Sequence, residues 1–492
     1  MIAQLPILQV IVPLVAAPLC LFIGRPKLVW LFTLVSSFMA FIISVVLLQQ
    51  VMTNGTIIYS LGGWSAPIGI EYRIDYLNAY LSLIISATSS IILLAAHTSI
   101  TAEIEESKLT LFYVLFLICL AGMLGIVASG DVFNVFVFLE ISALASYSLI
   151  ALGSDRRALT AALRYLLVGT VGATFILIGI GLMYITTGTL NMHDLSLQLV
   201  NVADSRTLVT AFSFFTVGVC LKLALFPLHW WLPNAYSFAP SVVGALLAAT
   251  ATKVAIYILL RFIFTIFGVE FSFSILPLQY ILVALGLAGI FVASITAIYQ
   301  QDVKQLFAYS SVAQVAYMML ALGLNNTSGL VATLLHLFNH ALMKGALFLA
   351  LAGVMYRVGS VQLEHFSGLG QRMPWTMAAI VIGGLSLVGL PLTVGFISKW
   401  YLLRATLENG WWPMAVLILI GSLLSIVYVW RIVEAAYFTP SVESSSNIKE
   451  APLSILLPTW LLVLANLYFG TDTNFTVTIS NLTAQYLLGA SP

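Results

Sequence analysis

Long apolar runs, separated by short polar or glycine- and proline-containing breaks, follow one another along nearly the whole chain. Most runs last about 20 residues, the length that an α-helix needs to cross the hydrocarbon core of a bilayer. The pattern predicts about 14 membrane-spanning helices, two of which are broken near a proline. The predicted spans are 5–23, 29–50, 77–97, 109–128, 132–153, 161–187, 208–235 (broken), 241–267, 275–300, 303–323, 328–356, 375–407 (broken), 412–437 and 452–470.

The composition excludes a soluble protein, because 61% of the 492 residues are hydrophobic and only 8% are charged. A soluble domain of this size cannot bury so much apolar surface. We therefore predict an all-α polytopic membrane protein that lies in the lipid bilayer and keeps its first apolar run as a span. The net charge of +1 says nothing about partners, and no basic patch suggests nucleic acid, so we predict no nucleic-acid partner.

Lysines and arginines are distributed unevenly between the loops on the two sides of the predicted bundle. One side holds Arg25, Lys27, Lys108, Arg156, Arg157, Lys304, Arg357, Arg372, Arg431 and Lys449, and the other mainly Arg73, Arg206, Arg261 and Arg404. Because basic loops stay in the cytoplasm, both termini are predicted on the outer side of the cell inner (plasma) membrane. That placement requires an even number of spans.

An internal repeat relates two parts of the chain at a nearly constant offset. Four matches occur in the same order: Tyr147 in SYSLIALG with Tyr317 in VAYMMLALG, Asp131 in DVF with Asp302 in DVK, Tyr184 in GLMY with Tyr356 in AGVMY, and Pro227 in FPL with Pro391 in LPL. Their offsets are 170, 171, 172 and 164 residues.

Each copy of the repeat contains five predicted spans. Because five is odd, the second copy must enter the membrane from the opposite side, which is an inverted-repeat transporter architecture. The predicted organisation is three leading helices (1–108), a first five-helix repeat (109–267), a second five-helix repeat (268–438), and a final helix with a C-terminal tail (439–492).

The stretch Phe215–Pro240 combines features that are unfavourable in hydrocarbon. It carries Lys222, is broken at Pro227 and continues into His229. Such residues mark ion paths in membrane proteins, and a helix break leaves room for water. Lysine suits a proton relay because it can release its proton when buried, whereas arginine stays charged. The next span adds Lys253. Snorkelling to the surface is the alternative for both lysines, and it fits poorly because both lie far from an interface.

Glu140, about nine residues into the fifth span, is the only carboxylate near the centre of a predicted helix. A lone buried carboxylate would take up a proton, so we expect a lysine of the same half to hold it ionised. Such a pair can load and unload a proton. A purely structural buried ion pair is the alternative.

The eleventh span contains HLFNHALMK, in which His336, His340 and Lys344 are spaced at i, i+4 and i+8. This spacing places them on one helix face as a polar stripe, which favours a proton wire. Two histidines at i, i+4 can also bind zinc, but no third ligand presents itself and Lys344 would repel a cation. Histidines that only hydrogen-bond between helices are a further alternative. We predict no metal site.

Lys399 follows the second break, in GLPLTVGF, and is the expected end of the second half-path. With Lys222 and Lys253 it would complete a row of basic groups through both halves. Trp230, Trp231, Trp411 and Trp412 are interpreted as interfacial belt residues. Cys20, Cys119 and Cys220 have neither metal nor redox spacing, and we predict that they act as buried hydrophobes.

Taken together, these motifs resemble the antiporter-like membrane subunits of Mrp-type multisubunit cation/proton antiporters, respiratory complex I and membrane-bound hydrogenases. The resemblance covers almost the whole chain. It implies proton transfer between half-channels by Glu140, Lys222, Lys253 and Lys399, with His336, His340 and Lys344 as the linking relay. FISKWYL and FLEISALASYSLIALG look most like the D-type subunit of Mrp antiporters, followed by the N-type subunit of complex I.

The resemblance implies a subunit that moves protons against Na+, Li+ or K+ and works with other membrane subunits. The alternative is a proton-pumping subunit of NADH-quinone oxidoreductase or of a hydrogenase. A helical scaffold without transport is a third hypothesis. No flavin, nucleotide, haem or iron–sulfur motif occurs, so we predict no cofactor and no enzymatic redox centre in this chain.

Overall fold

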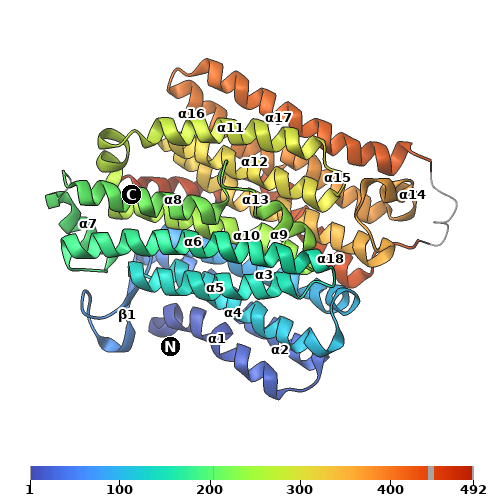
Figure 1. Ribbon diagram of the computed structural model, residues 1–492, viewed down its shortest axis with the longest axis horizontal. Coiled ribbons are helices and arrows are strands. Elements are labelled where there is room, and N and C mark those ends of the chain that lie inside the picture. Colours follow the sequence, from blue (N-terminus) through green and yellow to red (C-terminus); the bar gives the residue numbers. More distant parts are fainter. Residues whose placement is uncertain (1, 203, 441–447, 490–492) are drawn as a thin grey trace.

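The computed structural model describes residues 2–202, 204–440 and 448–489, which form a bundle of long helices running in roughly the same direction (Figure 1). Within these residues, thirteen helices are long and apolar enough to cross a membrane. Two shorter helices, α15 and α16, follow one another and together make one more crossing. The predicted all-α architecture of about 14 spans is thus confirmed.

The helix bounds follow the predicted spans one for one. The leading helices are α1 (Leu5–Leu19), α2 (Pro26–Asn54) and α3 (Tyr76–Glu103). The first repeat contains α4 (Leu109–Ala128), α5 (Val132–Ala151), α6 (Arg156–Thr187), α8 (Arg206–Leu223), α9 (Leu232–Phe238) and α10 (Ser241–Leu260). The second contains α11 (Leu278–Ile298), α12 (Val303–Gly323), α13 (Thr327–Val358), α15 (Pro374–Val388), α16 (Val394–Glu408) and α17 (Trp412–Val433), and α18 (Leu453–Thr471) is the last crossing.

Short strands and α-helices also lie outside the predicted spans. They are the antiparallel strands β1 (Ile57–Ser60) and β2 (Glu71–Ile74) and the helices α7 (Met192–Leu199), α14 (Leu369–Arg372) and α19 (Asn474–Leu487). The strands form a hairpin between α2 and α3, and α19 packs against α3 and α13. Each is too short or too polar to give the signal of a span, which is why the pattern of apolar runs did not predict them.

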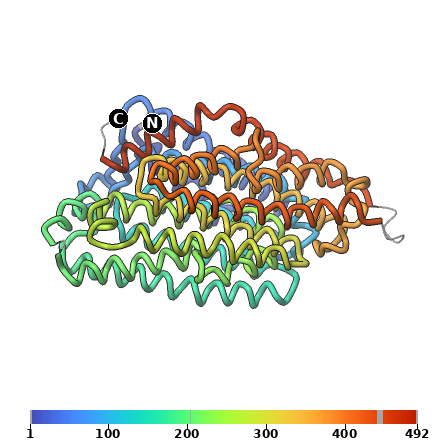
Figure 2. Tube along the Cα trace, turned by 90° about the horizontal axis from the view of Figure 1, so that it is seen from above, coloured from blue at the N-terminus to red at the C-terminus, as the bar shows by residue number. Residues whose placement is uncertain are grey.

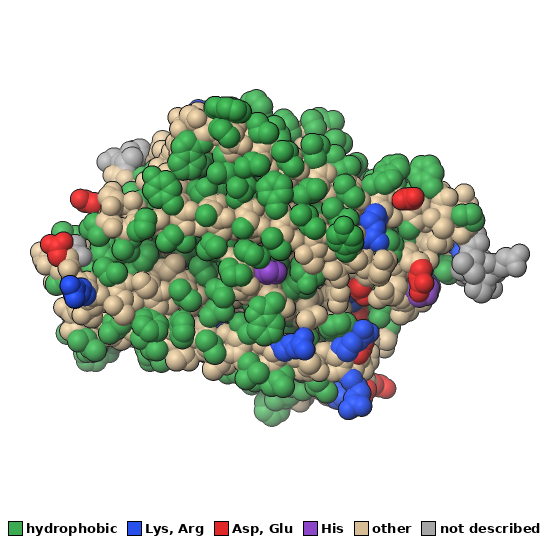
Figure 3. Space-filling view, turned by 45° about the horizontal axis from the view of Figure 1, so that its top comes forward, with side chains coloured by type: hydrophobic (Ala, Val, Ile, Leu, Met, Phe, Trp, Pro, Cys, Tyr) green, Lys and Arg blue, Asp and Glu red, His purple; other side chains and the backbone are tan. Residues whose placement is uncertain are grey.

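The N and C marks both lie toward the left-hand end of the bundle in Figure 1 and in Figure 2. We call this side the N/C side. The opposite side, which carries the loops with Arg25, Lys108 and Lys304, is called the basic side. Hydrophobic side chains cover the middle of the surface, and most charged side chains gather toward its two ends (Figure 3). This distribution is the one expected for a protein surrounded by lipid.

The two repeats are built alike at opposite sides of the bundle. On the N/C side, Asp131 caps the start of α5 and its backbone pairs with Asn191 in an isolated β-bridge. On the basic side, Asp302 caps α12 and pairs with Gln362 in the same way, 171 residues later. Two helices lie between the bridge residues in each repeat, and the second of them, α6 or α13, is 32 residues long in both. The predicted inverted repeat is confirmed.

Each repeat also contains one broken helix with the same backbone signature. The helix α8 stops at Leu223, and the next residue, Ala224, has a φ angle of +58°. The helix α15 stops at Val388, followed by Gly389 with a φ angle of +91°. A left-handed residue ends a helix and leaves its last carbonyl groups available to side chains. Both breaks therefore expose backbone acceptors within the bundle.

Candidate functional site

The predicted pairing of Glu140 with a lysine of the same half is present. Lys222, at the end of α8, donates to Glu140 Oε1 on α5 at 3.2 Å. The Lys222 side chain is 5% exposed and that of Glu140 is 26% exposed. The Lys222 ammonium also lies 3.5 Å from the hydroxyl of Tyr147, which follows Glu140 on α5. Two helices that are far apart in sequence thus supply one half-buried ion pair.

A small cavity of about 30 Å³ lies beside Lys222. Its lining includes Ser142 and Ser146 from α5, Tyr165 from α6, and Ala251 and Ala255 from α10. This volume is enough for about one water molecule, and the two serines and the tyrosine provide polar groups. The cavity therefore lies between the ion pair and the helix that carries Lys253.

Trp231 closes the first break from inside the bundle. Its indole Nε1 donates to the carbonyl oxygen of Leu221 at 3.0 Å, and its ring stacks on Tyr165 with a centroid distance of 3.9 Å. The residue is buried, so its interpretation as an interfacial belt residue is wrong, whereas Trp230 and Trp412 are exposed. The indole N–H is thus received by a carbonyl group in the last turn of α8, directly before the break.

Lys253 lies fully buried in the middle of α10. Its ammonium donates to the carbonyl oxygen of Ala248, and the ion pairs of the described residues do not include it. The helix α10 packs against α8 on one side and against α13 on the other. Lys253 therefore sits on the helix that separates the Glu140–Lys222 pair from the histidines.

The polar stripe of α13 is fully buried, as its spacing predicted. His336 Nδ1 is 2.7 Å from Ser398 Oγ, and the rings of His336 and His340 lie nearly parallel at 6.0 Å between centroids. Lys344 donates to the carbonyl oxygen of Phe307 at 2.7 Å. Both ring nitrogens of His340 have no protein partner among the described residues.

Within the described part of the chain, no three histidine, cysteine or acidic side chains come together as a group that could hold a metal ion. The three cysteines are buried and unpaired. The stripe of α13 therefore offers protonatable nitrogens to one another and to small hydrogen-bonding groups.

Lys399, on α16, meets the freed carbonyl groups of the second break. It donates to Leu387 O and Val388 O, both at 2.8 Å, and to Ser422 Oγ at 2.6 Å. The end of a helix carries a partial negative charge, so these carbonyl groups stabilise an ammonium group without a carboxylate. The second half thus holds its lysine with neutral acceptors, whereas the first half uses Glu140.

A tyrosine from the repeated motif contacts the lysine of the broken helix in both halves. Tyr147 meets Lys222 through its hydroxyl group, and Tyr317 lies with its ring 5.0 Å from the Lys399 ammonium. At the offsets of 170 and 171 that bracket Glu140, the second repeat has Ser310 and Ser311, so it has no carboxylate at this place. Sequence reasoning used the two tyrosines only to align the repeat, and did not predict that they contact the lysines.

Six of the seven predicted side chains are buried on helices that pack in sequence: α8 against α10, α10 against α13, and α13 against α16. The seventh, Glu140, is half-buried on α5. Within the described interactions, Glu140 and Lys222 form the only ion pair among the seven, and His336 and His340 form a stacked ring pair. Arg261 corrects the loop assignment made from sequence, because it is buried and paired with Asp75. Arg261 lies four residues after Tyr257 and eight after Lys253, and this spacing was the available signal.

Residues 129–425 match the family described as NADH:quinone oxidoreductase/Mrp antiporter, TM. This chain belongs to that family. It is 39% identical to the N subunit of NADH-quinone oxidoreductase from Desulforudis audaxviator, over 96% of either chain. It is 29% identical to the D-type subunit of the Na(+)/H(+) antiporter from Bacillus subtilis, over 98% of this chain and 97% of that one.

Two solved structures share the fold over nearly the whole chain. One chain of the membrane-bound sulfane sulfur reductase, an archaeal respiratory membrane complex, superposes with a TM-score of 0.89 at 30% identity, covering 99% of this chain and 98% of that one. A chain of the Mrp complex from Dietzia sp. DQ12-45-1b superposes with a TM-score of 0.90 at 22% identity, covering 99% and 97%. The first of these chains belongs to a respiratory membrane complex and the second to the Mrp complex.

Proposed function

We propose that this chain is the proton-translocating subunit, of the D type, in a multisubunit Na+(Li+, K+)/H+ antiporter. The observation that carries the proposal is the row of buried bases on four successively packed helices, with one carboxylate paired to its first member. Intramembrane ionisable groups that line up in this way are typical of proton relays.

Each side chain has a role in the proposed path. Glu140 sets the charge of Lys222, and Lys222 exchanges a proton with Lys253 across the small cavity. His340 and His336, with Lys344, carry the proton from α10 to α16. Lys399 receives it and releases it through the second break. Because these bases are buried, a charge change at one station shifts the protonation of its neighbours.

A polar cavity of about 250 Å³ on the basic side supports an inlet there. Its lining includes Glu103, Asp155, Arg157, Asp302 and Lys304, from helix ends of the leading part and of both repeats. In the proposal the basic side faces the cytoplasm, and both termini face outward across the plasma membrane. The proposed path then has its cytoplasmic end at this cavity.

A second candidate is a proton-pumping subunit of an electron-transfer complex. It is favoured by the 39% identity to the N subunit of NADH-quinone oxidoreductase and by the 30% identity to a chain of a respiratory complex. In that setting the same row of bases moves protons, but the driving reaction takes place in other subunits. The antiporter setting requires no such reaction, and uses a cation gradient with partner membrane subunits.

The relay is tested with Glu140→Ala and Lys222→Ala in the assembled complex, reconstituted in vesicles. We expect each variant to abolish coupled proton movement while the complex still assembles. Lys108→Ala is the control, because the ion pair that Lys108 forms within the described residues is with the exposed Glu105. Coupled proton movement retained in both Glu140→Ala and Lys222→Ala would overturn the proposed path.

The setting is tested on the purified complex in vesicles with a pH-sensitive dye. Proton movement on adding Na+, Li+ or K+ alone supports the antiporter. Proton movement that requires a reductant and quinone, and is insensitive to these cations, supports the second candidate and refutes the first.

A further inference from the structure

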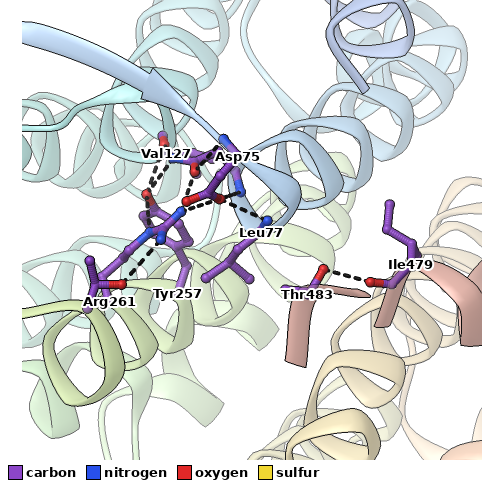
Figure 4. Close-up of polar contacts among 9 residues, drawn as sticks. Asp75, Leu77, Val127, Tyr257, Arg261, Ile479 and Thr483 are labelled. Carbon is purple, nitrogen blue, oxygen red and sulfur yellow. Dashed lines mark hydrogen bonds and ion pairs between the residues drawn. The ribbon is translucent and has the colours of Figure 1, made fainter. Parts of the chain in front are cut away.

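A second buried ion pair lies at the N/C end of α10, outside the row of bases. Arg261 Nη2 donates to Asp75 Oδ1 at 2.5 Å, and the two side chains are 5% and 1% exposed. Asp75 directly precedes α3, so the pair joins the leading helices to the first repeat (Figure 4). Nothing in the proposed relay uses these two residues.

The guanidinium group is held on several sides. Its Nε donates to the hydroxyl of Tyr257 at 3.2 Å, its Nη1 to Thr265 at 3.3 Å, and its Nη2 also to Asn78 Oδ1. The Tyr257 hydroxyl in turn donates to the carbonyl oxygen of Val127, at the end of α4 (Figure 4). The cluster therefore fills the space between α3, α4 and α10 with fixed polar groups.

Arg261 lies on the same face of α10 as Lys253. Lys253, Tyr257 and Arg261 are spaced at i, i+4 and i+8, which puts them one above another along the helix. The Lys253 ammonium points to Ala248 O, toward the basic side. Along this face, a proton leaving Lys253 toward the N/C side would meet the Tyr257 hydroxyl and then Arg261.

Stability alone does not explain a buried ion pair, because well-packed apolar residues at the same place usually make the fold as stable or more stable. Arginine differs from lysine in that it does not release its proton in a protein. We propose that Arg261, fixed by Asp75, is a permanent positive barrier that closes the row of bases toward the N/C side. It keeps protons on Lys253 from leaking out of the first half. This inference rests on the proposed relay through Lys253.

The test is Arg261→Lys, which keeps a cation opposite Asp75 but makes it able to release a proton. The complex is reconstituted in vesicles with a preset pH difference and no transported cation or reductant. We expect the passive proton flux to rise about tenfold, the change produced by a barrier lower by about 1.4 kcal/mol. Adding Lys253→Ala to Arg261→Lys should return the flux to the wild-type value.

Two matched variants separate a barrier from a structural pair. Asp75→Asn breaks the ion pair but keeps the permanent charge, so the vesicles should stay tight. Arg431→Lys is the control, because Arg431 ends α17 at the equivalent place of the second repeat and donates to the carbonyl oxygens of Ile298 and Gln300. It should also leave the vesicles tight.

A tight Arg261→Lys complex would overturn the barrier, and so would a leak that persists in the Arg261→Lys, Lys253→Ala variant. If Arg261→Lys does not assemble, Asp75→Asn with Arg261→Gln removes both charges and should leak. Failure of both to assemble would show a purely structural pair. Because this assay measures passive flux, its failure is distinct from failure of coupled transport in Glu140→Ala.

Discussion

The Glu140–Lys222 pair gives the most quantitative prediction. Replacing Glu140 by Gln keeps the side-chain shape but removes the charge opposite a lysine that is 5% exposed. At 3.2 Å and an effective dielectric constant of about 20, the attraction between the two groups is about 5 kcal/mol. Breaking a buried pair from one side costs about 3–5 kcal/mol, and the 26% exposure of Glu140 places the expected loss near the lower end, at about 3 kcal/mol.

The partner variant Lys222→Met removes the other charge and leaves the carboxylate without its cation. The double variant Glu140→Gln, Lys222→Met contains neither charge, so most of the loss should be recovered, because a neutral pair needs no counter-charge. The thermal midpoint of the assembled complex in detergent should therefore be higher for the double variant than for either single variant. Coupled proton movement should be absent in all three.

Two results would refute this reasoning. Stability losses that simply add in the double variant would mean that the two residues are not coupled across the 3.2 Å contact. Coupled proton movement in the double variant would mean that the pair holds the helices together and takes no part in moving protons.

The remaining predictions concern the residues around the two lysines and the basic side. Tyr147→Phe should slow proton movement several-fold in the vesicle assay, because it removes the hydroxyl beside Lys222. Tyr317→Phe should leave the rate nearly unchanged, because Lys399 lies over the ring and the Tyr317 hydroxyl has no partner among the described residues. Gly169→Ala should reduce proton movement, because the added Cβ atom would come within 1.9 Å of the Tyr147 hydroxyl. Gly181→Ala is the control, because a Cβ atom there meets open space. Equal activity of the two variants would contradict the packing argument. Burial raises the pKa of the Asp302 carboxyl above its unfolded value, so protonation of Asp302 favours the folded state. The thermal midpoint should therefore fall as pH rises through the folded pKa, and Asp302→Asn should remove that dependence. The same pH profile in the wild type and in Asp302→Asn would contradict this prediction.

The sequence by itself determined the spans, the repeat and most of the row of bases. Each crossing must be apolar over about 20 residues, so the helix bounds were visible in one dimension. The break near Pro227 and its counterpart near Pro391 were visible because proline cannot continue a helix. Glu140 and Lys222 were found because charges inside apolar runs are rare, and their pairing followed from the need to neutralise a buried carboxylate.

Only the tertiary structure decided which groups meet side by side. The roles of Tyr147 and Tyr317, the neutral acceptors around Lys399, and the burial of Trp231 depend on helices distant in sequence. Arg261 shows the reason most clearly. From the sequence, Arg261 was counted among the basic residues of the outer side, near the end of the predicted span 241–267, and no partner was identified for it. Its partner Asp75 lies 186 residues away, and only packing of α3 against α10 brings the two charges together inside the protein.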